Sequence, residues 1–444
     1  MTRRKSLILA LATLALLAGS WLAAGRPGRT AEAVLLDPAT LEQAHFARLP
    51  AAAEGIAFFE RRLAADPQDA VSMTLLGQLY LSQARQSGAV AGYARAQTAL
   101  EGALALLPGY APAETALAAV LFSQHRFQEA LSLAQALYDA DPRRLDALAI
   151  AADSHFALGR YAEAEAGYAE LLERAPGPAL YARLAHQAEL HGRPAEALEL
   201  LERAAGAALA QGLPQHEVAW YFLRLGEVNF NRGRLAAARG YYAAAVKLDG
   251  DYPPALAALA KAYAAEGETG EAIGLYQQSL AHVPAPEVLA ALGDLYASLG
   301  RPAEAQAQYD TVLFIGRLSV LNEQLYNRQL ATFLADHNLE PGQALALATA
   351  ELEARQDIYG YDAAAWAAYK AGDLAQAGAR MAQALSLGTQ DARLFYHAGM
   401  IALAQGRPDE ARQWLGRALA LNPHFDPLQA EQARQSLQEI GTKR

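Results

Sequence analysis

The sequence predicts an all-α protein built as a solenoid of antiparallel helix hairpins. Its composition is rich in Ala, Leu and Arg and poor in β-branched residues, which favours helix because these side chains lose little freedom there. Pro108, Pro142 and Pro176 lie 34 residues apart, and so do Gly250 and Pro284. This spacing suits a repeated unit of two helices. The length of 444 residues therefore indicates one repeated unit and not several separate cores.

A short turn centred on Gly recurs between the predicted helices of each hairpin. A Gly just past a helix takes the left-handed conformation that ends the helix, and a following Pro suits the first turn of the next one. The turns are Gly159-Arg160, Gly192-Arg193-Pro194, Gly233-Arg234, Gly267-Glu268, Gly300-Arg301-Pro302, Gly372-Asp373 and Gly406-Arg407-Pro408. Each turn is expected to close one helix and open another.

The pattern divides residues 70–425 into about ten hairpins. They are predicted at 70–110, 111–144, 145–177, 178–215, 219–252, 253–285, 286–318, 319–357, 358–391 and 392–425. Residues 34–69 are interpreted as a degenerate capping hairpin and 426–444 as a C-terminal capping helix, because a solenoid must cover its two end faces. The period is broken at 85–95, 206–217 and 336–341, where we expect longer or irregular loops.

The apolar positions carry a recognisable motif. A large apolar residue, Leu-Gly and Tyr occur in predicted first helices, and Ala, an aromatic residue and Pro occur in predicted second helices. Examples are Met73, Leu76, Gly77 and Tyr80, then Leu289, Leu292, Gly293 and Tyr296 with Ala305 and Tyr309, and also Ala164, Tyr168 and Pro176. At these positions the chain resembles the bacterial members of the tetratricopeptide repeat (TPR) family. The resemblance implies a right-handed superhelical solenoid and a protein-binding role, but it carries over no ligand.

The N-terminus has the charge order of an export signal. Arg3, Arg4 and Lys5 precede an apolar stretch from Leu7 to Ala24. This stretch is long for a cleaved signal and just long enough to span a membrane, so 1–33 is expected to be a signal peptide or a membrane anchor. Either alternative places the remaining chain on the extracytoplasmic side.

Composition and motifs argue against several functions. The net charge of -10 disfavours nucleic acid as a partner, and the absence of Cys excludes disulfides and thiolate chemistry. No phosphate-binding loop, Gly-x-Ser-x-Gly elbow or His-Glu-x-x-His helix occurs, since His216-Glu217 lacks the second His. We therefore expect a protein that is not an enzyme and needs no cofactor or metal.

The first helices of such a solenoid line a concave groove, where peptides commonly bind. Aligning them on one another predicts that an aromatic and acidic set points inward: Asp146, Asp153, Phe156, His186, Trp220, Glu227, Phe230, Asp294, Asp362, Trp366, Tyr369, Tyr396 and Met400, together with Lys261 and Glu287. Such a lining favours protein or peptide partners with basic and apolar residues, with Trp366 as the best anchor, unless Trp366 and Tyr369 pack between hairpins.

The leading hypothesis is an extracytoplasmic scaffold or adaptor, attached to the membrane if the N-terminal segment is not cleaved. One alternative is an accessory enzyme acting on cell-envelope polymers, with the repeats holding the substrate. Another is a repeat-type signalling or transcriptional regulator, which would require a cytoplasmic location.

Overall fold

The computed structural model describes residues 52–442, apart from 88–90 and 322–326. The chain divides into the units Met1–Glu42 and Gln43–Arg444, and all described residues belong to the second, which is described by itself. The expected signal or anchor over 1–33 and the first part of the expected capping hairpin lie outside the described residues. None of the described helices is both long enough and apolar enough to cross a membrane.

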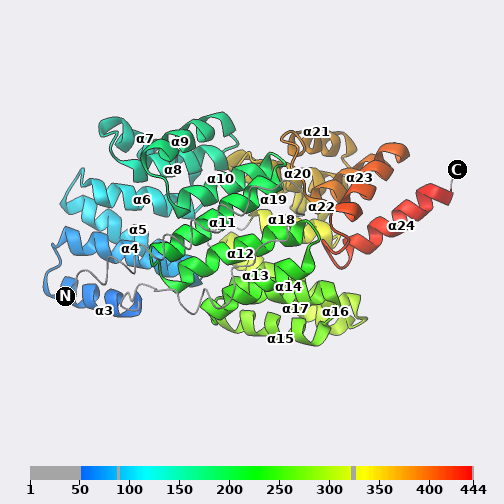
Figure 1. Cartoon of the computed structure of the whole chain (residues 1–444), viewed down its shortest axis with the longest axis horizontal. Coiled ribbons are helices and arrows are strands. Elements are labelled where there is room, and N and C mark those ends of the chain that lie inside the picture. The colour runs from blue at the N-terminus through cyan, green and yellow to red at the C-terminus, as the bar shows by residue number, and fades with distance from the viewer. Residues whose placement is uncertain (1–51, 88–90, 322–326, 443–444) are drawn as a thin grey trace, which may run out of the picture. The chain divides into compact units, whose positions relative to one another are not determined.

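The described part of the chain contains helices and no strand (Figure 1). The helices are α3 (Ala52–Ala65), α4 (Ala70–Ser87), α5 (Ala91–Leu106), α6 (Ala111–Ser123), α7 (Phe127–Ala140), α8 (Leu145–Ala157), α9 (Tyr161–Arg174), α10 (Pro178–Leu190), α11 (Pro194–Ala210), α12 (Gln215–Asn231), α13 (Leu235–Leu248), α14 (Pro253–Glu266), α15 (Thr269–His282), α16 (Pro286–Ser298), α17 (Pro302–Leu321), α18 (Asn327–Asp336), α19 (Pro341–Ala354), α20 (Ile358–Lys370), α21 (Leu374–Ala384), α22 (Ala392–Ala404), α23 (Pro408–Leu421) and α24 (Gln429–Thr442). The all-α fold class is confirmed.

The helices pack as consecutive antiparallel pairs, from α4 with α5 to α22 with α23. We call the even-numbered member of each pair the first helix and the odd-numbered member the second helix. In the described chain, α3 packs on α4 and α24 packs on α23. The seven turn glycines predicted to end first helices all adopt left-handed conformations, with φ between 67° and 87°. This part of the prediction is confirmed.

The Gly of the repeat motif lies where the two helices of a hairpin approach most closely. A Cβ atom at Gly293 would lie 2.4 Å from the ring of Tyr309, and one at Gly226 would lie 2.4 Å from the ring of Tyr242. No Cβ atom fits at these distances unless the Tyr ring or its helix shifts. The motif residues therefore act in packing, as the resemblance implies.

One of the three expected irregular loops differs from the prediction. The extra residues near 206–217 are mostly helical, because α11 continues to Ala210 and α12 begins at Gln215 and not at 219. Ala and Leu continue the helical pattern of α11 through this segment. The turn after α18 is irregular as expected, with positive φ at Asn338 and Glu340.

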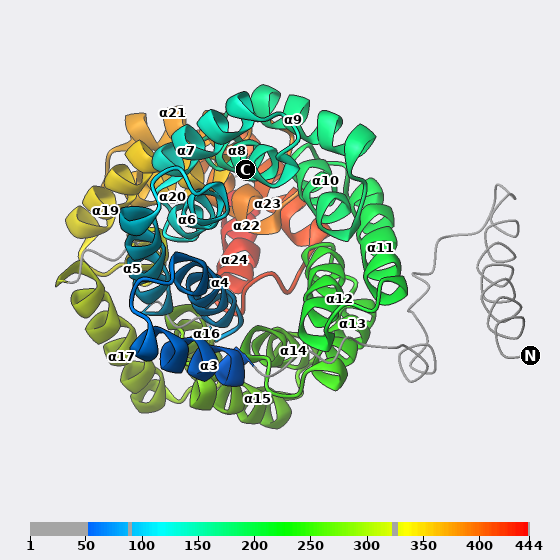
Figure 2. The ribbon, with the colours of Figure 1, turned by 90° about the vertical axis from the view of Figure 1, so that its left-hand side faces the viewer.

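The hairpins wind around a common axis, so residues almost two hundred positions apart lie side by side (Figure 2). Three hydrogen bonds join successive windings. Ile358 N donates to Tyr161 Oη at 3.1 Å, Thr389 Oγ1 donates to the Leu190 carbonyl at 2.5 Å, and Asn422 Nδ2 donates to the Phe230 carbonyl at 2.8 Å. Their partners are separated by 197, 199 and 192 residues, so the contact recurs once per hairpin.

The same loops also touch through their backbones. A Cβ atom at Gly159 would lie 2.3 Å from the Gln356 carbonyl oxygen, and one at Gly192 would lie 2.4 Å from the Gly388 carbonyl oxygen. The turns that close α8 and α10 thus lie directly against the loops that precede α20 and α22. Successive windings of the solenoid are in contact there, which partly encloses its concave side.

Candidate functional site

A cavity of about 980 Å³ lies among the first helices of the central hairpins. Its wall is largely apolar and comes mainly from α12, α14, α16 and α17, with Pro253, Ala257, Val288, Ile315 and Leu318 among its residues. Arg85 from α4 and Tyr359 from α20 complete the lining, although these helices belong to different windings. The winding of the solenoid therefore builds this cavity from segments that are far apart in the sequence.

The cavity holds one strong ion-pair cluster. Arg224 pairs with Glu189 at 2.8 Å and also with Glu227, its neighbour on α12. The two carboxylates, which surround Arg224 at close range, raise the pKa of this buried guanidinium despite the opposing effect of burial. One guanidinium thus faces two carboxylates, so the cluster of Arg224, Glu189 and Glu227 holds more negative than positive charge.

Two other cations in the cavity form no ion pair with a described residue. Lys261 is exposed to the cavity and its Nζ lies 4.3 Å from the centre of the Phe230 ring. Arg85 donates to Ser123 Oγ at 3.0 Å and to the Ala119 carbonyl at 3.4 Å. The enclosing protein lowers the pKa of both cations, because a charge surrounded by protein is less well solvated.

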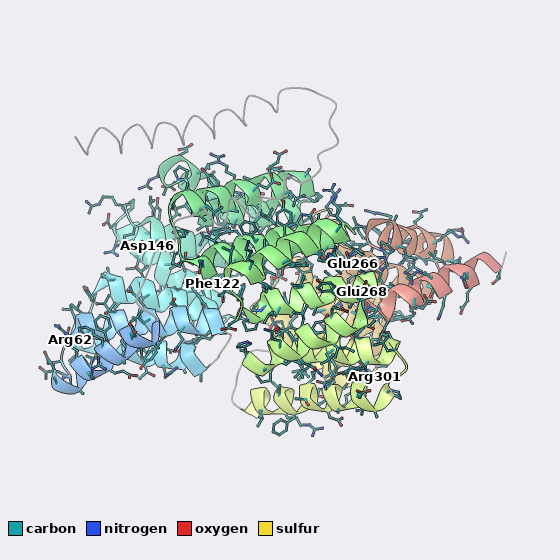
Figure 3. The ribbon with its side chains drawn as sticks, turned by 60° about the horizontal axis from the view of Figure 1, so that its bottom comes forward. Arg62, Phe122, Asp146, Glu266, Glu268 and Arg301 are labelled. Atoms are coloured by element: carbon teal, nitrogen blue, oxygen red, sulfur yellow. The ribbon has the colours of Figure 1, made fainter. Side chains whose placement is uncertain are left out.

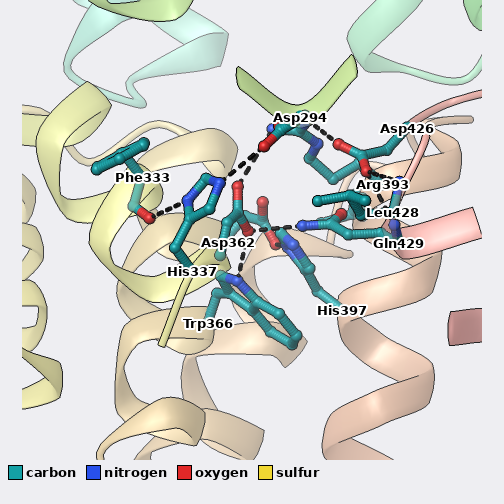
Figure 4. Close-up of polar contacts among 12 residues, drawn as sticks. Asp294, Phe333, His337, Asp362, Trp366, Arg393, His397, Asp426, Leu428 and Gln429 are labelled. Atoms are coloured by element: carbon teal, nitrogen blue, oxygen red, sulfur yellow. Dashed lines mark hydrogen bonds and ion pairs between the residues drawn. The ribbon is translucent and has the colours of Figure 1, made fainter. Parts of the chain in front are cut away.

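A polar network lies among α18, α20, α22 and α24 (Figure 4). It contains hydrogen bonds from Trp366 Nε1 to Asp336 at 2.8 Å and from Gln429 Nε2 to Asp336 at 2.7 Å. His397 Nδ1 contacts Asp362 Oδ1 at 2.8 Å, and the His397 ring stacks on Trp366 at 4.1 Å. The network ties the C-terminal helix α24 to α18, and most of its side chains are buried.

His337 joins this network to α16. Its Nε2 lies 2.8 Å from Asp294 Oδ1, and its Nδ1 lies 2.8 Å from the Phe333 carbonyl. Burial alone would lower the pKa of His337, but the hydrogen bond and the charge of Asp294 outweigh burial and raise it. Burial raises the pKa of Asp336. Across the described residues, no group of His, Asp and Glu side chains is arranged to hold a metal ion.

The predicted inward residues of the central hairpins separate into two groups. His186, Glu227 and Phe230 line the cavity, together with Lys261 and Glu287. The others do not line it. Asp146 is exposed on α8 (Figure 3), Asp153 pairs with Arg183 at 2.7 Å, and Asp294 contacts His337 at 2.8 Å. Phe156 packs on Tyr161, and Trp220 is 40% exposed beside Tyr221.

The C-terminal predictions need a correction. Trp366 is 1% exposed, Tyr396 0% and Met400 7%, and Asp362 is also buried. Tyr369 is half-buried and stacks on Trp366 at 4.9 Å. The prediction of a ligand anchor at Trp366 is wrong, because this side chain is buried against Asp336 of α18 and against Tyr396 and His397 of α22. Its role is in packing, which was the alternative that the sequence left open.

The sequence analysis missed many of the cavity residues, among them Arg85, Arg224 and Tyr359. Arg224 lies one helical turn before Glu227 on α12, so its helical spacing was a usable signal. Arg85 and Tyr359 come from other windings, and no pattern within one repeat places them beside the cavity.

The architecture defines a class of protein: an α-helical repeat array whose windings enclose a cavity large enough to hold a ligand. Four family models, each described as a tetratricopeptide repeat, match the chain at residues 121–190, 255–287, 286–313 and 392–425. The chain is a tetratricopeptide repeat family protein, as the motif residues and these matches together show. The repeats make it a scaffold for protein–protein interaction.

One similar protein is the cellulose synthase operon protein C of Pseudomonas fluorescens (strain SBW25). It is 29% identical over 181 residues, which cover 40% of this chain and only 14% of that protein. Its bacterial source fits the expected bacterial origin.

Solved structures with similar folds are the APC/C hetero-tetramer Cut9-Hcn1 and the yeast Tom70. The first is 16% identical with a TM-score of 0.37, covering 87% of this chain and 92% of that chain. The second is 12% identical with a TM-score of 0.37, covering 88% and 92%. A tetratricopeptide repeat protein from Parabacteroides merdae is 21% identical with a TM-score of 0.32, covering 62% and 98%. These scores carry no argument about function.

Proposed function

We propose that the chain is a non-enzymatic scaffold on the extracytoplasmic side of the membrane that holds a segment of a partner protein in the cavity among α12, α14 and α16. The observation that carries this proposal is the cavity itself, with its apolar wall and a few charged groups. A volume of about 980 Å³ is large enough for several side chains of a bound segment. Pockets of this composition are typical of ligand and peptide sites.

Site-specific photo-crosslinking tests the proposal. A photoreactive amino acid is introduced at Glu287, which is exposed and lines the cavity. The matched control places it at Gln278, which is exposed on the neighbouring helix α15 and lies outside the cavity lining. We expect the Glu287 variant to form a discrete adduct with a partner in cells, and the Gln278 variant to form none. Equal labelling from both positions, or no adduct from Glu287, would refute the cavity as the binding site.

The location is supported by the order of charged and apolar residues at the N-terminus, from Arg3 to Ala24. The Pseudomonas relative is named for a cellulose synthase operon, and an extracytoplasmic scaffold is compatible with that name. Alkaline phosphatase fused after residue 60 should be active, because this enzyme folds outside the cytoplasm. An inactive fusion with a normal expression level would contradict the proposed location.

A further inference from the structure

A second cavity, of about 670 Å³, lies at the contact between successive windings. One wall comes from the turns before α7 and α9 and from the first residues of these helices. The other wall comes from the end of α19, the start of α20 and the end of α21. Ile358 and Tyr161, whose hydrogen bond of 3.1 Å joins the two windings, both line this cavity. A ligand bound here would therefore contact both windings at once.

The charges that line the second cavity balance. Arg126 donates two hydrogen bonds to the Glu129 carboxylate, at 2.7 and 2.6 Å. Arg160 and Glu353 carry opposite charges, and neither forms an ion pair with a described residue. Two cations thus stand against two carboxylates, so the lining favours neither an anionic nor a cationic ligand by its net charge.

His125 adds no charge to this lining. Its ring stacks on Phe127, with the ring centroids 5.4 Å apart. Burial lowers the pKa of His125 to about 4, and the nearby guanidinium groups of Arg355 and Arg328 act in the same direction. The imidazole is therefore neutral at pH 7 and carries one donor and one acceptor nitrogen.

The exposed part of the lining is rich in neutral polar groups. Apart from Ala354, every exposed residue that lines the second cavity is polar. The side chains of Gln356, Gln383 and Ser386 are exposed and form no hydrogen bond with a described residue. The hydroxyl of the half-buried Tyr361 likewise has no hydrogen-bond partner among the described residues. Amides and hydroxyls both donate and accept, so these groups suit a ligand that does the same at several positions.

This chemistry differs from that of the cavity among α12, α14 and α16. A protein segment is held mainly by apolar and aromatic anchors that fill apolar pockets, and the wall with Val288, Ile315 and Leu318 offers such a pocket. The second cavity instead combines free amides and hydroxyls with the half-buried rings of Tyr161 and Tyr361. A sugar ring has hydroxyl groups along its edge and C–H groups on its faces, so it matches both parts of this lining.

We infer that the second cavity binds a neutral oligosaccharide across the two windings, with its hydroxyl groups bonded to Gln356 and Gln383 and the face of a sugar ring packed on Tyr361. The cavity lies within the range of about 300–1,000 Å³ that is usual for small-molecule sites. The chain then binds a protein segment and an oligosaccharide at two separate sites. A bound sugar also stabilises the contact between windings, because it binds only where both walls are in place.

Isothermal titration calorimetry on the purified full chain tests this inference. The ligands are neutral hexasaccharides built from glucose or from N-acetylglucosamine, and the comparison ligands are hexagalacturonate, which is acidic, and a neutral hexapeptide of Ser and Tyr. The variant Gln356→Ala with Gln383→Ala removes two amides from the lining. The matched control, Gln278→Ala with Gln376→Ala, removes two exposed amides outside it. Circular dichroism checks that each variant is folded.

At least one neutral hexasaccharide should bind the wild type and the control variant with equal affinity. The lining variant should bind it roughly tenfold more weakly, as expected for the loss of two neutral hydrogen bonds. Hydrogen exchange should show that the bound sugar protects the start of α9 and the start of α20, which lie on opposite walls of the cavity.

Three results would overturn the inference. They are no binding by any of the neutral hexasaccharides, tighter binding of hexagalacturonate or of the hexapeptide, and an affinity for the sugar that the lining variant leaves unchanged. Crosslinking at Glu287 reports on the other cavity, so a failure there leaves this inference standing, and a failure here leaves the proposed function standing.

Discussion

The contact between windings can be tested at a single glycine. Gly192 has a φ of 67°, and a Cβ atom there would lie 2.4 Å from the Gly388 carbonyl oxygen. In Gly192→Ala, the left-handed conformation costs about 1 kcal/mol. Relieving the clash requires the two loops to separate by roughly 1 Å, since ordinary contacts begin near 3.4 Å. That shift breaks the buried hydrogen bond from Thr389 Oγ1 to Leu190, at a further cost of about 1–3 kcal/mol.

Gly267→Ala is the matched control. Gly267 also ends a first helix, with a φ of 87°, but no atom lies within 4 Å of the position of its Cβ. This control therefore carries the conformational cost without the clash. Hydrogen exchange is the suitable assay, because a long repeat array does not unfold as one unit and local opening can be measured.

Amide exchange at the end of α10 and the start of α22 should be about tenfold faster or more in Gly192→Ala than in the wild type. In Gly267→Ala these two segments should exchange as in the wild type. If α10 and α22 exchange in Gly192→Ala as they do in Gly267→Ala and in the wild type, the windings do not touch at Gly192. Contact between windings would then not enclose the cavity.

Three further outcomes are expected. Trp366→Ala should lower the free energy of local opening of α20 and α22 by about 3–5 kcal/mol in hydrogen exchange, because its side chain is buried; a change under 1 kcal/mol would show that it is not. Gly293→Ala should cost about 1–3 kcal/mol through overpacking, whereas Gly274→Ala, with no atom near its Cβ, should gain about 0.5–1 kcal/mol; the reverse order would contradict the packing. The raised pKa of His337 beside Asp294 means that their contact stabilises the fold fully below the ordinary histidine pKa of about 6.5, and that this stability is lost as the pH rises through the raised value. His337→Gln should therefore flatten the dependence of Tm on pH in this window, and an unchanged profile would disprove the linkage.

The repeat architecture could be predicted because each hairpin repeats the same local rules. The turn glycines need a left-handed conformation, and the motif glycines Gly226 and Gly293 need the absence of a Cβ atom, so both leave a periodic signal. Those signals lie within one repeat, so they can be recognised in a single sequence without an alignment. They correctly predict the fold class and the positions of most first helices.

The site was harder to predict because it depends on contacts between windings. Arg85 and Tyr359 reach the cavity only through the path of the solenoid, which no single repeat encodes. Trp366 was predicted to face an open groove because its helical register points inward. In the structure, Trp366 Nε1 donates to Asp336, and Gln429 of the C-terminal helix α24 donates to the same carboxylate. The charge of the site also depends on pairing, which composition does not report.

The most direct test of the cavity as the binding site is hydrogen exchange of the chain with and without a partner segment captured at Glu287. The account predicts protection of α12, α14 and α16 on binding, with their second helices α13 and α15 changed much less. Protection confined to second helices, or to α20 and α22, would contradict it.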